Sequence, residues 1–348
     1  MLFPVTSTAV HYHFLLSALI LIVSGAWAQS VSGETLPASR GWAQHMKAAH
    51  DLQNRGNTSK AEKEVAAAVT DAKATLGRNE EFALALGTAG VFYQDIGKFS
   101  QAESSLNKSL KIWTEVAGRD DLRLVPVVSR IAWLYVETGH ASEVSRLHLV
   151  SWIDRLAVSD PRSEYLPALH ESLGGMFSLQ GKFARAEEEY RTALDLLAAR
   201  GSLHSPAAAS ALNNFGLIYA RAGRFDQAIN CFSQALQLLK QLAGTDDLPV
   251  AMAAESLADV YLRVGQYDES GRLFEHAVAI IEQKCGPNSL RTAYALSKYA
   301  RLLHTLKRNR EASGLEFRAR QIRAESIADS YLGQTVEVRN LARRRGEP

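Results

Sequence analysis

The chain is short of the residues and motifs on which most enzymes depend. Among its 348 residues there are two cysteines, and the His-Glu-x-x-His, Gly-x-Ser-x-Gly, phosphate-loop and Cys-x-x-Cys motifs are all missing. Ser105-x-x-Lys108 matches a bare Ser-x-x-Lys pattern, but the motifs that accompany it in enzymes are missing too. The histidines do not fall at spacings that would let them share a metal ion. These absences predict a protein that is not an enzyme and that holds no metal or cofactor.

A charge excess of either sign is also missing. The chain has 39 Lys and Arg residues against 37 Asp and Glu residues, for a formal net charge of +2. A surface that binds nucleic acid needs a large excess of Lys and Arg, because it must neutralise a row of phosphates. We therefore expect no nucleic acid among the partners.

One long apolar run stands out, and it belongs to residues 1–28. The run from Phe14 to Val23 is shorter than the roughly 20 residues that cross a membrane. Ala26-Trp27-Ala28 follows, with small residues at the two positions that a signal peptidase reads. We expect a secretory leader that is cut after Ala28, and a periplasmic or extracellular protein. The segment before the run has no Lys or Arg, so a membrane partner stays open if the leader is not cleaved.

What the chain has in abundance is one repeated unit of 42 residues. A glycine recurs at this spacing, each time at the end of an apolar helical pattern: Gly97, Gly139, Gly181, Gly223 and Gly265. Glycine reaches the left-handed conformation that ends many helices, so each unit is predicted to be a helix, a tight turn and a second helix. A fixed period over most of a chain indicates a stack of like units.

The unit from Ala209 to Leu239 shows the pattern most clearly. We expect Gly216 and Ala228 to let its two helices approach closely, while Tyr219 and Phe232 fill the flanking gaps. By the same register, Cys285 corresponds to a position about 18 Å along a helix from Cys231, too far for a disulfide. Two free thiols are therefore predicted.

The spacing resembles the tetratricopeptide-repeat family. The family pattern appears as Leu212-x-x-Phe215-Gly216-x-x-Tyr219 and then Ala228-x-x-x-Phe232. The usual period is about 34 residues, and the longer unit is similar to the kinesin-light-chain type. Two units depart from the pattern, because His148 stands where an aromatic residue is expected and Lys307 stands at the glycine position of the last unit.

The resemblance implies an all-α fold, a right-handed α-solenoid of antiparallel helix pairs. Its extent divides the chain into four parts: a leader over 1–28, a polar linker over 29–40, about seven helix pairs over 41–325 and a C-terminal tail over 326–348. Within the tail, residues 335–339 alternate like a short strand.

The resemblance also implies a binding surface, because the first helix of each pair lines the concave groove in this family. Side-chain amides suit the main chain of an extended peptide, and Arg and Lys suit carboxylates. Each position also fits an ordinary solvated residue. The expected groove residues are Arg130, Trp133, Glu171, Asn213, Asn214, Arg221, Glu255, Asp259, Arg263, Lys298 and Arg301.

We therefore expect a scaffold without enzymatic activity that binds a protein or peptide partner in its groove. Two alternatives stay open. One is a structural subunit of a cell-envelope assembly, which would use the edges and the convex side of the array. The other is an enzyme whose site the sequence does not reveal.

Overall fold

The computed structural model describes residues 41–54, 57–76 and 79–324. The predicted leader, linker and tail lie outside the described residues. The chain divides between Ser256 and Leu257, within one helix, into two compact units.

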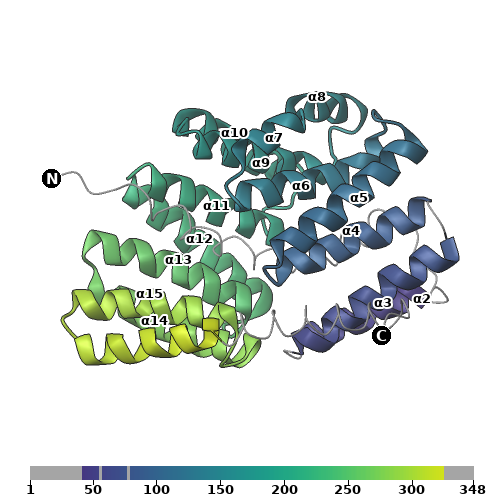
Figure 1. Cartoon of the computed structure of the whole chain (residues 1–348). Coiled ribbons are helices and arrows are strands. Elements are labelled where there is room, and N and C mark those ends of the chain that lie inside the picture. The colour runs from purple at the N-terminus through teal and green to yellow at the C-terminus, as the bar shows by residue number, and fades with distance from the viewer. Residues whose placement is uncertain (1–40, 55–56, 77–78, 325–348) are drawn as a thin grey trace, which may run out of the picture. The chain divides into compact units, whose positions relative to one another are not determined.

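The first unit is a stack of antiparallel helix pairs (Figure 1). We call the first helix of each pair the A helix and the second the B helix. In the third pair the B helix is broken into two pieces, and a short 3-10 helix η3 (Leu122–Leu124) precedes the A helix. Pairs 1 to 5 are α2 (Gly41–Asn54) with α3 (Thr58–Leu76), α4 (Glu80–Asp95) with α5 (Phe99–Ala117), α6 (Val125–Glu137) with α7 (Ala141–Arg146) and α8 (Leu149–Ser159), α9 (Tyr165–Leu179) with α10 (Phe183–Ala199), and α11 (Pro206–Arg221) with α12 (Phe225–Ala243).

The sixth pair contains the helix in which the units divide. Its A helix is α13 (Leu248–Val264) and its B helix is α14 (Tyr267–Cys285). The seventh pair consists of α15 (Leu290–Thr305) and the helical residues 309–324. The described residues therefore contain seven helix pairs and no strand, which confirms the predicted all-α fold of antiparallel pairs.

Left-handed residues end the A helices at the predicted positions. The glycines of the 42-residue repeat, Gly97 to Gly265, all have φ between 72° and 83°. In the seventh pair Lys307 takes over this conformation with φ 62°. Because this conformation costs glycine no steric strain, the repeated glycine stops each A helix at the same point.

Small residues let the A and B helices of a pair pack closely, as predicted. A Cβ added to Gly216 would lie 2.8 Å from the ring of Phe232, and one on Gly174 would lie 2.8 Å from the ring of Tyr190. The small position of the B helix is at most 1% exposed in every pair: Ala61, Ala102, Val144, Ala186, Ala228, Ser270 and Ala312.

The third pair departs from this regularity at His148. This residue has φ 52°, which is uncommon outside glycine, and it separates α7 from α8. At the same repeat position the B helices of pairs 2, 4, 5 and 6 bury a large side chain, whereas His148 is exposed. Leu149 is buried in its place, so the apolar face of α8 is shifted by one residue: Leu149, Trp152, Ile153 and Leu156 match Phe232, Ala235, Leu236 and Leu239.

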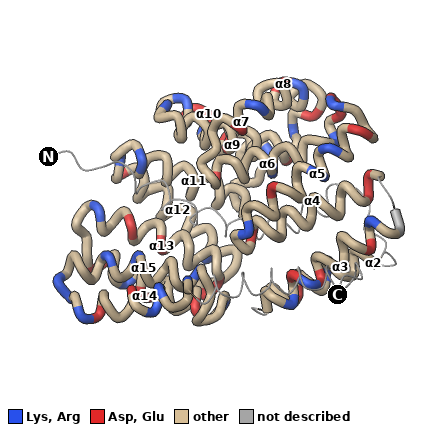
Figure 2. Tube along the Cα trace, in the orientation of Figure 1, with Lys and Arg blue, Asp and Glu red and all other residues tan. Residues whose placement is uncertain are grey.

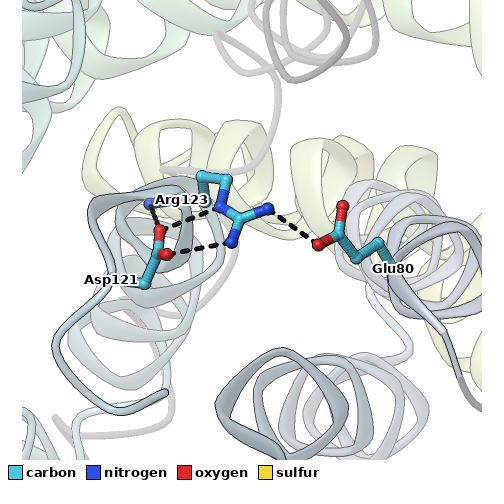
Figure 3. Close-up of polar contacts among 3 residues, drawn as sticks. All are labelled: Glu80, Asp121 and Arg123. Carbon is cyan, nitrogen blue, oxygen red and sulfur yellow. Dashed lines mark hydrogen bonds and ion pairs between the residues drawn. The ribbon is translucent and has the colours of Figure 1, made fainter. Parts of the chain in front are cut away.

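An arginine at the start of the third pair joins it to the second (Figure 3). Arg123 donates to both carboxylate oxygens of Asp121 and, at 2.7 Å, to Glu80 in the first turn of α4. The hydrogen bonds from Arg123 hold the pKa of Asp121 below its ordinary value. Because the arginine is half-exposed, water weakens this ion pair, and we ascribe to it alignment more than stability.

Acidic and basic residues are interspersed along the helices (Figure 2). Cys231 and Cys285 are both free thiols, as predicted. Among the helices that the structure describes, none combines the length and apolar character needed to cross a membrane.

Candidate protein-binding surface

The predicted groove residues all lie on A helices, from α6 to α15, and they differ widely in exposure. Arg263 and Arg301 are exposed. Four more are half-buried, namely Arg130, Trp133, Arg221 and Asp259. The remaining five are buried: Glu171, Asn213, Asn214, Glu255 and Lys298. Their role in binding stays a prediction.

Buried polar contacts connect the A helices of pairs 2 and 3. Arg130 on α6 forms an ion pair of 3.0 Å with Asp95 on α4. Gln94 donates to Glu137 over 2.8 Å, and both side chains are buried. Burial raises the pKa of Asp95 to about 6, although the positive charge of Arg130 acts in the opposite direction.

A similar set of contacts connects the A helices of pairs 4 and 5. The Asn214 amide donates to the carboxylate of Glu171 over 3.0 Å, and Arg221 donates to the main-chain oxygen of Ser178 over 3.2 Å. Burial raises the pKa of Glu171 to about 7, because its neutral partner Asn214 offsets the loss of water only in part.

Three of these four contacts share one register. Gln94 and Glu137, Asn214 and Glu171, and Arg221 and Ser178 are each 43 residues apart. One repeat is 42 residues, so neighbouring A helices bond with an offset of one residue. The carboxylates and amides of this surface therefore serve first to hold one A helix against the next.

In the second unit, Asp259 forms ion pairs with two of the predicted groove residues. One is Arg301 on α15, and the other, at 3.4 Å, is Arg263 on the same helix as Asp259. The ammonium group of Lys298 lies 5.1 Å from the ring centre of Tyr294, a cation–π distance. The arginines remain exposed and can meet a carboxylate of a partner.

Several buried side chains of the first unit have a polar atom with no hydrogen bond to a described residue, and Asn213 and Trp133 are among them. Asn213 is 1% exposed, and its Oδ1 receives no hydrogen bond from any described residue. The indole Nε1 of Trp133 is likewise buried and donates to no described residue. Such atoms carry a free-energy cost that a bound partner can relieve.

Three residues of this surface were not predicted: Gln94, Asp95 and Glu137. A signal for two of them was present, because Asp95 and Glu137 stand at the same repeat position as Arg221 and Arg263. This position is acidic in pairs 2 and 3 and basic in pairs 5 and 6. A comparison of whole repeat positions, rather than of single residues, would have found it.

Comparison with known proteins agrees with this architecture. Residues 165–241 and 249–325 match the family model described as tetratricopeptide repeat. The chain is a tetratricopeptide-repeat protein. No curated protein matches it.

Solved structures show the fold of this tetratricopeptide-repeat protein in other chains. BtubC (BKLC) from P. vanneervenii is 22% identical with a TM-score of 0.53, and the match covers 66% of this chain and 92% of that one. A putative kinesin light chain of Podosopora anserina is 19% identical with a TM-score of 0.50, over 60% and 97% of the two chains. A Rap protein in complex with Competence and Sporulation Factor is 12% identical with a TM-score of 0.58, over 91% and 97%.

The tetratricopeptide fold is that of a protein-interaction scaffold, and proteins built from these repeats are generally not enzymes. The described residues contain no cluster of three His, Cys, Asp or Glu side chains that could hold a metal ion. The fold thus indicates protein binding as the general role.

Proposed function

We propose that the chain is an exported scaffold that binds a peptide or protein segment along its A-helix surface. The hydrogen bonds between neighbouring A helices support this proposal, because they hold the surface in one arrangement before a partner arrives. A surface that is already ordered loses less conformational entropy on binding than a mobile one. Apolar packing would hold the helices together as well, so buried carboxylates such as Glu171 and Asp95 call for a further reason.

The Oδ1 atom of Asn213 carries the proposal. Asn213 lies between its repeat equivalents Glu171 and Glu255 in sequence register, and all three side chains are buried. Because its oxygen has no donor among the described residues, a main-chain N–H of a bound segment would supply the missing hydrogen bond once the side chain, buried in the free protein, turns toward the surface. In the same way, the indole N–H of Trp133 would donate to a main-chain carbonyl of the bound segment.

Asn213→Ala tests this role. A purely structural role predicts only a stability effect, whereas a binding role predicts a loss of affinity as well. We expect the substitution to leave the free energy of unfolding unchanged or to raise it by up to about 1 kcal/mol, because it removes an unsatisfied polar atom. We expect affinity for the partner to fall by about fivefold, which corresponds to one hydrogen bond.

The partner for this test is the protein recovered by a pull-down with residues 29–348. Asn230→Ala is the matched control, because Asn230 is an exposed residue of α12 whose side chain bonds, among the described residues, only to Gln234. The control should change neither stability nor affinity. Normal binding by the Asn213→Ala protein would contradict a binding role for the A-helix surface.

Export is the second part of the proposal and depends on the sequence of residues 1–28. The apolar run and the Ala26-Trp27-Ala28 site support a cleaved leader. The mass and N-terminal sequence of the protein from its native source would test it. A mature chain that begins at Gln29 is the expected result, and a chain that keeps its leader would point to a membrane anchor.

A further inference from the structure

In three of the pairs, one B-helix position carries a carboxylate that contacts the next pair. Glu62, Glu103 and Glu187 occupy this position in pairs 1, 2 and 4. The hydroxyl groups of Tyr135 and Tyr219, each on the A helix of the following pair, donate to Glu103 and Glu187 over 3.1 Å. The carboxylate therefore recognises a tyrosine of the next pair.

The same carboxylates also pair with a basic residue in the turn of the next pair. Lys98 lies 2.7 Å from Glu62, and Arg224 is ion-paired with Glu187. Both basic residues directly follow the repeated glycine. The B-helix carboxylate thus balances one turn cation at each of these two junctions.

The junction between pairs 3 and 4 lacks this arrangement. Ser145 stands at the carboxylate position and Phe177 at the tyrosine position. Lys182, the turn cation of pair 4, is present and exposed, but no carboxylate of the described residues lies within ion-pair distance of it. A second cation, Arg185, lies with its guanidinium 5.6 Å from the ring centre of Phe177. Two positive charges therefore border this junction without a carboxylate partner among the residues that the structure describes.

A surface depression lies at the same junction. Its volume is about 410 Å³, and its lining includes the apolar side chains of Val144, Leu149, Leu173 and Met176 beside Ser145 and His148. The Ser145 hydroxyl lies 3.3 Å from the Met176 sulfur. The break at His148 borders the depression, because His148 and Leu149 both line it.

We propose that this junction is a docking site for a segment of another protein that presents a carboxylate beside a large apolar side chain. The carboxylate takes the place that Glu62 and Glu187 occupy at the regular junctions and pairs with Lys182. The apolar side chain enters the depression above Leu173 and Met176. The site is built from α7, α8, α9 and the turn before α10, so it does not depend on the proposed use of the A-helix surface.

The probe is a capped heptapeptide of glycine and serine with one phenylalanine between two aspartates. The chain has four methionines, so ¹³C-methyl methionine NMR gives few and separable signals. We expect the Met176 methyl signal to shift with saturation as the peptide is added. The signals of Met46 on α2 and Met252 on α13 should not move. Peptides with alanine for phenylalanine, or lysine for aspartate, should not bind.

Two substitutions separate the charge from the depression. Lys182→Ala should weaken peptide binding by about fivefold, the effect of losing one charge-assisted contact. Ser145→Glu restores the carboxylate of the regular junctions, so it should occupy Lys182 from within and abolish peptide binding while the helical circular dichroism is kept. Lys98→Ala removes the equivalent cation of a regular junction and should leave binding unchanged.

Three results would overturn the proposal. The first is an unshifted Met176 signal at millimolar peptide, and the second is equal binding of the aspartate and lysine peptides. The third is normal binding by the Ser145→Glu protein. None of these results bears on the Asn213→Ala test, so the two proposals can fail separately.

Discussion

The fifth and third helix pairs share a period and a turn glycine, yet their B helices differ. In the fifth pair α12 is continuous, and Phe232 packs against Gly216 with no exposed surface. In the third pair His148 stands at the position of Phe232, and the helix breaks into α7 and α8. The comparison indicates that a large buried side chain at this position favours an unbroken B helix. It is not required, because the second helix of the seventh pair is continuous with Glu316 there.

The A helices show no such difference. Arg130 in the third pair and Asn214 in the fifth stand at the same repeat position and both bond to the preceding A helix. The irregularity is therefore confined to the B side. The B-helix face of the stack can change shape while the hydrogen bonds between neighbouring A helices are kept.

The largest effect should come from truncating the two equivalent B-helix residues. Phe232→Ala removes a fully buried aromatic ring and should lower the free energy of unfolding by about 3–5 kcal/mol. His148→Ala removes an exposed side chain and should change it by no more than about 0.5 kcal/mol. Urea titrations of both variants measure the contrast, and equal losses would contradict the register shift in α8.

A smaller effect on the free energy of unfolding should come from the ionisation of Glu171 on α9. Glu171 has a neutral partner, and its pKa of about 7 in the folded protein lies above the ordinary 4.5. The folded chain therefore holds a proton that the unfolded chain releases. The stability that this proton provides is complete below pH 4.5 and is lost as the pH rises to about 7.

Glu171→Gln keeps an acceptor for Asn214 and cannot ionise. Relative to the unsubstituted protein it should gain stability between pH 4.5 and 8, with a limit on the order of 3 kcal/mol. Melting temperatures at a series of pH values give this difference. A gain that is the same at every pH would show that ionisation of Glu171 is not its cause.

The smallest effect concerns the backbone at the break. His148→Gly should raise the free energy of unfolding by about 1 kcal/mol, because glycine adopts a φ of 52° without steric strain. Arg146→Gly, two residues earlier in α7, should lower it by about 1 kcal/mol because it weakens a helix. The opposite signs are the test, and a loss of stability in both variants would count against a left-handed residue 148.

Much of the architecture was predictable because it depends on local rules. Glycine at a helix end and a small residue facing a large one act within one pair, so Gly216 and Phe232 reveal both the turn and the packing. The break at His148 had a visible signal, a polar residue where an aromatic was expected. No sequence signal revealed the partners of the predicted groove residues. Asn214 and Glu171 meet because neighbouring A helices are offset by one residue, and this offset cannot be read from the sequence of one repeat.

By itself, the sequence determined the number of helix pairs, their turns and the faces that each helix buries. These follow from a 42-residue period and from which residues fit beside glycine and alanine. Only the tertiary structure decided which polar side chains bond across pairs, that five of the predicted groove residues are buried, and that one junction keeps a cation without its carboxylate. Those outcomes depend on how far one helix pair slides along the next, and the packing of whole surfaces sets that distance.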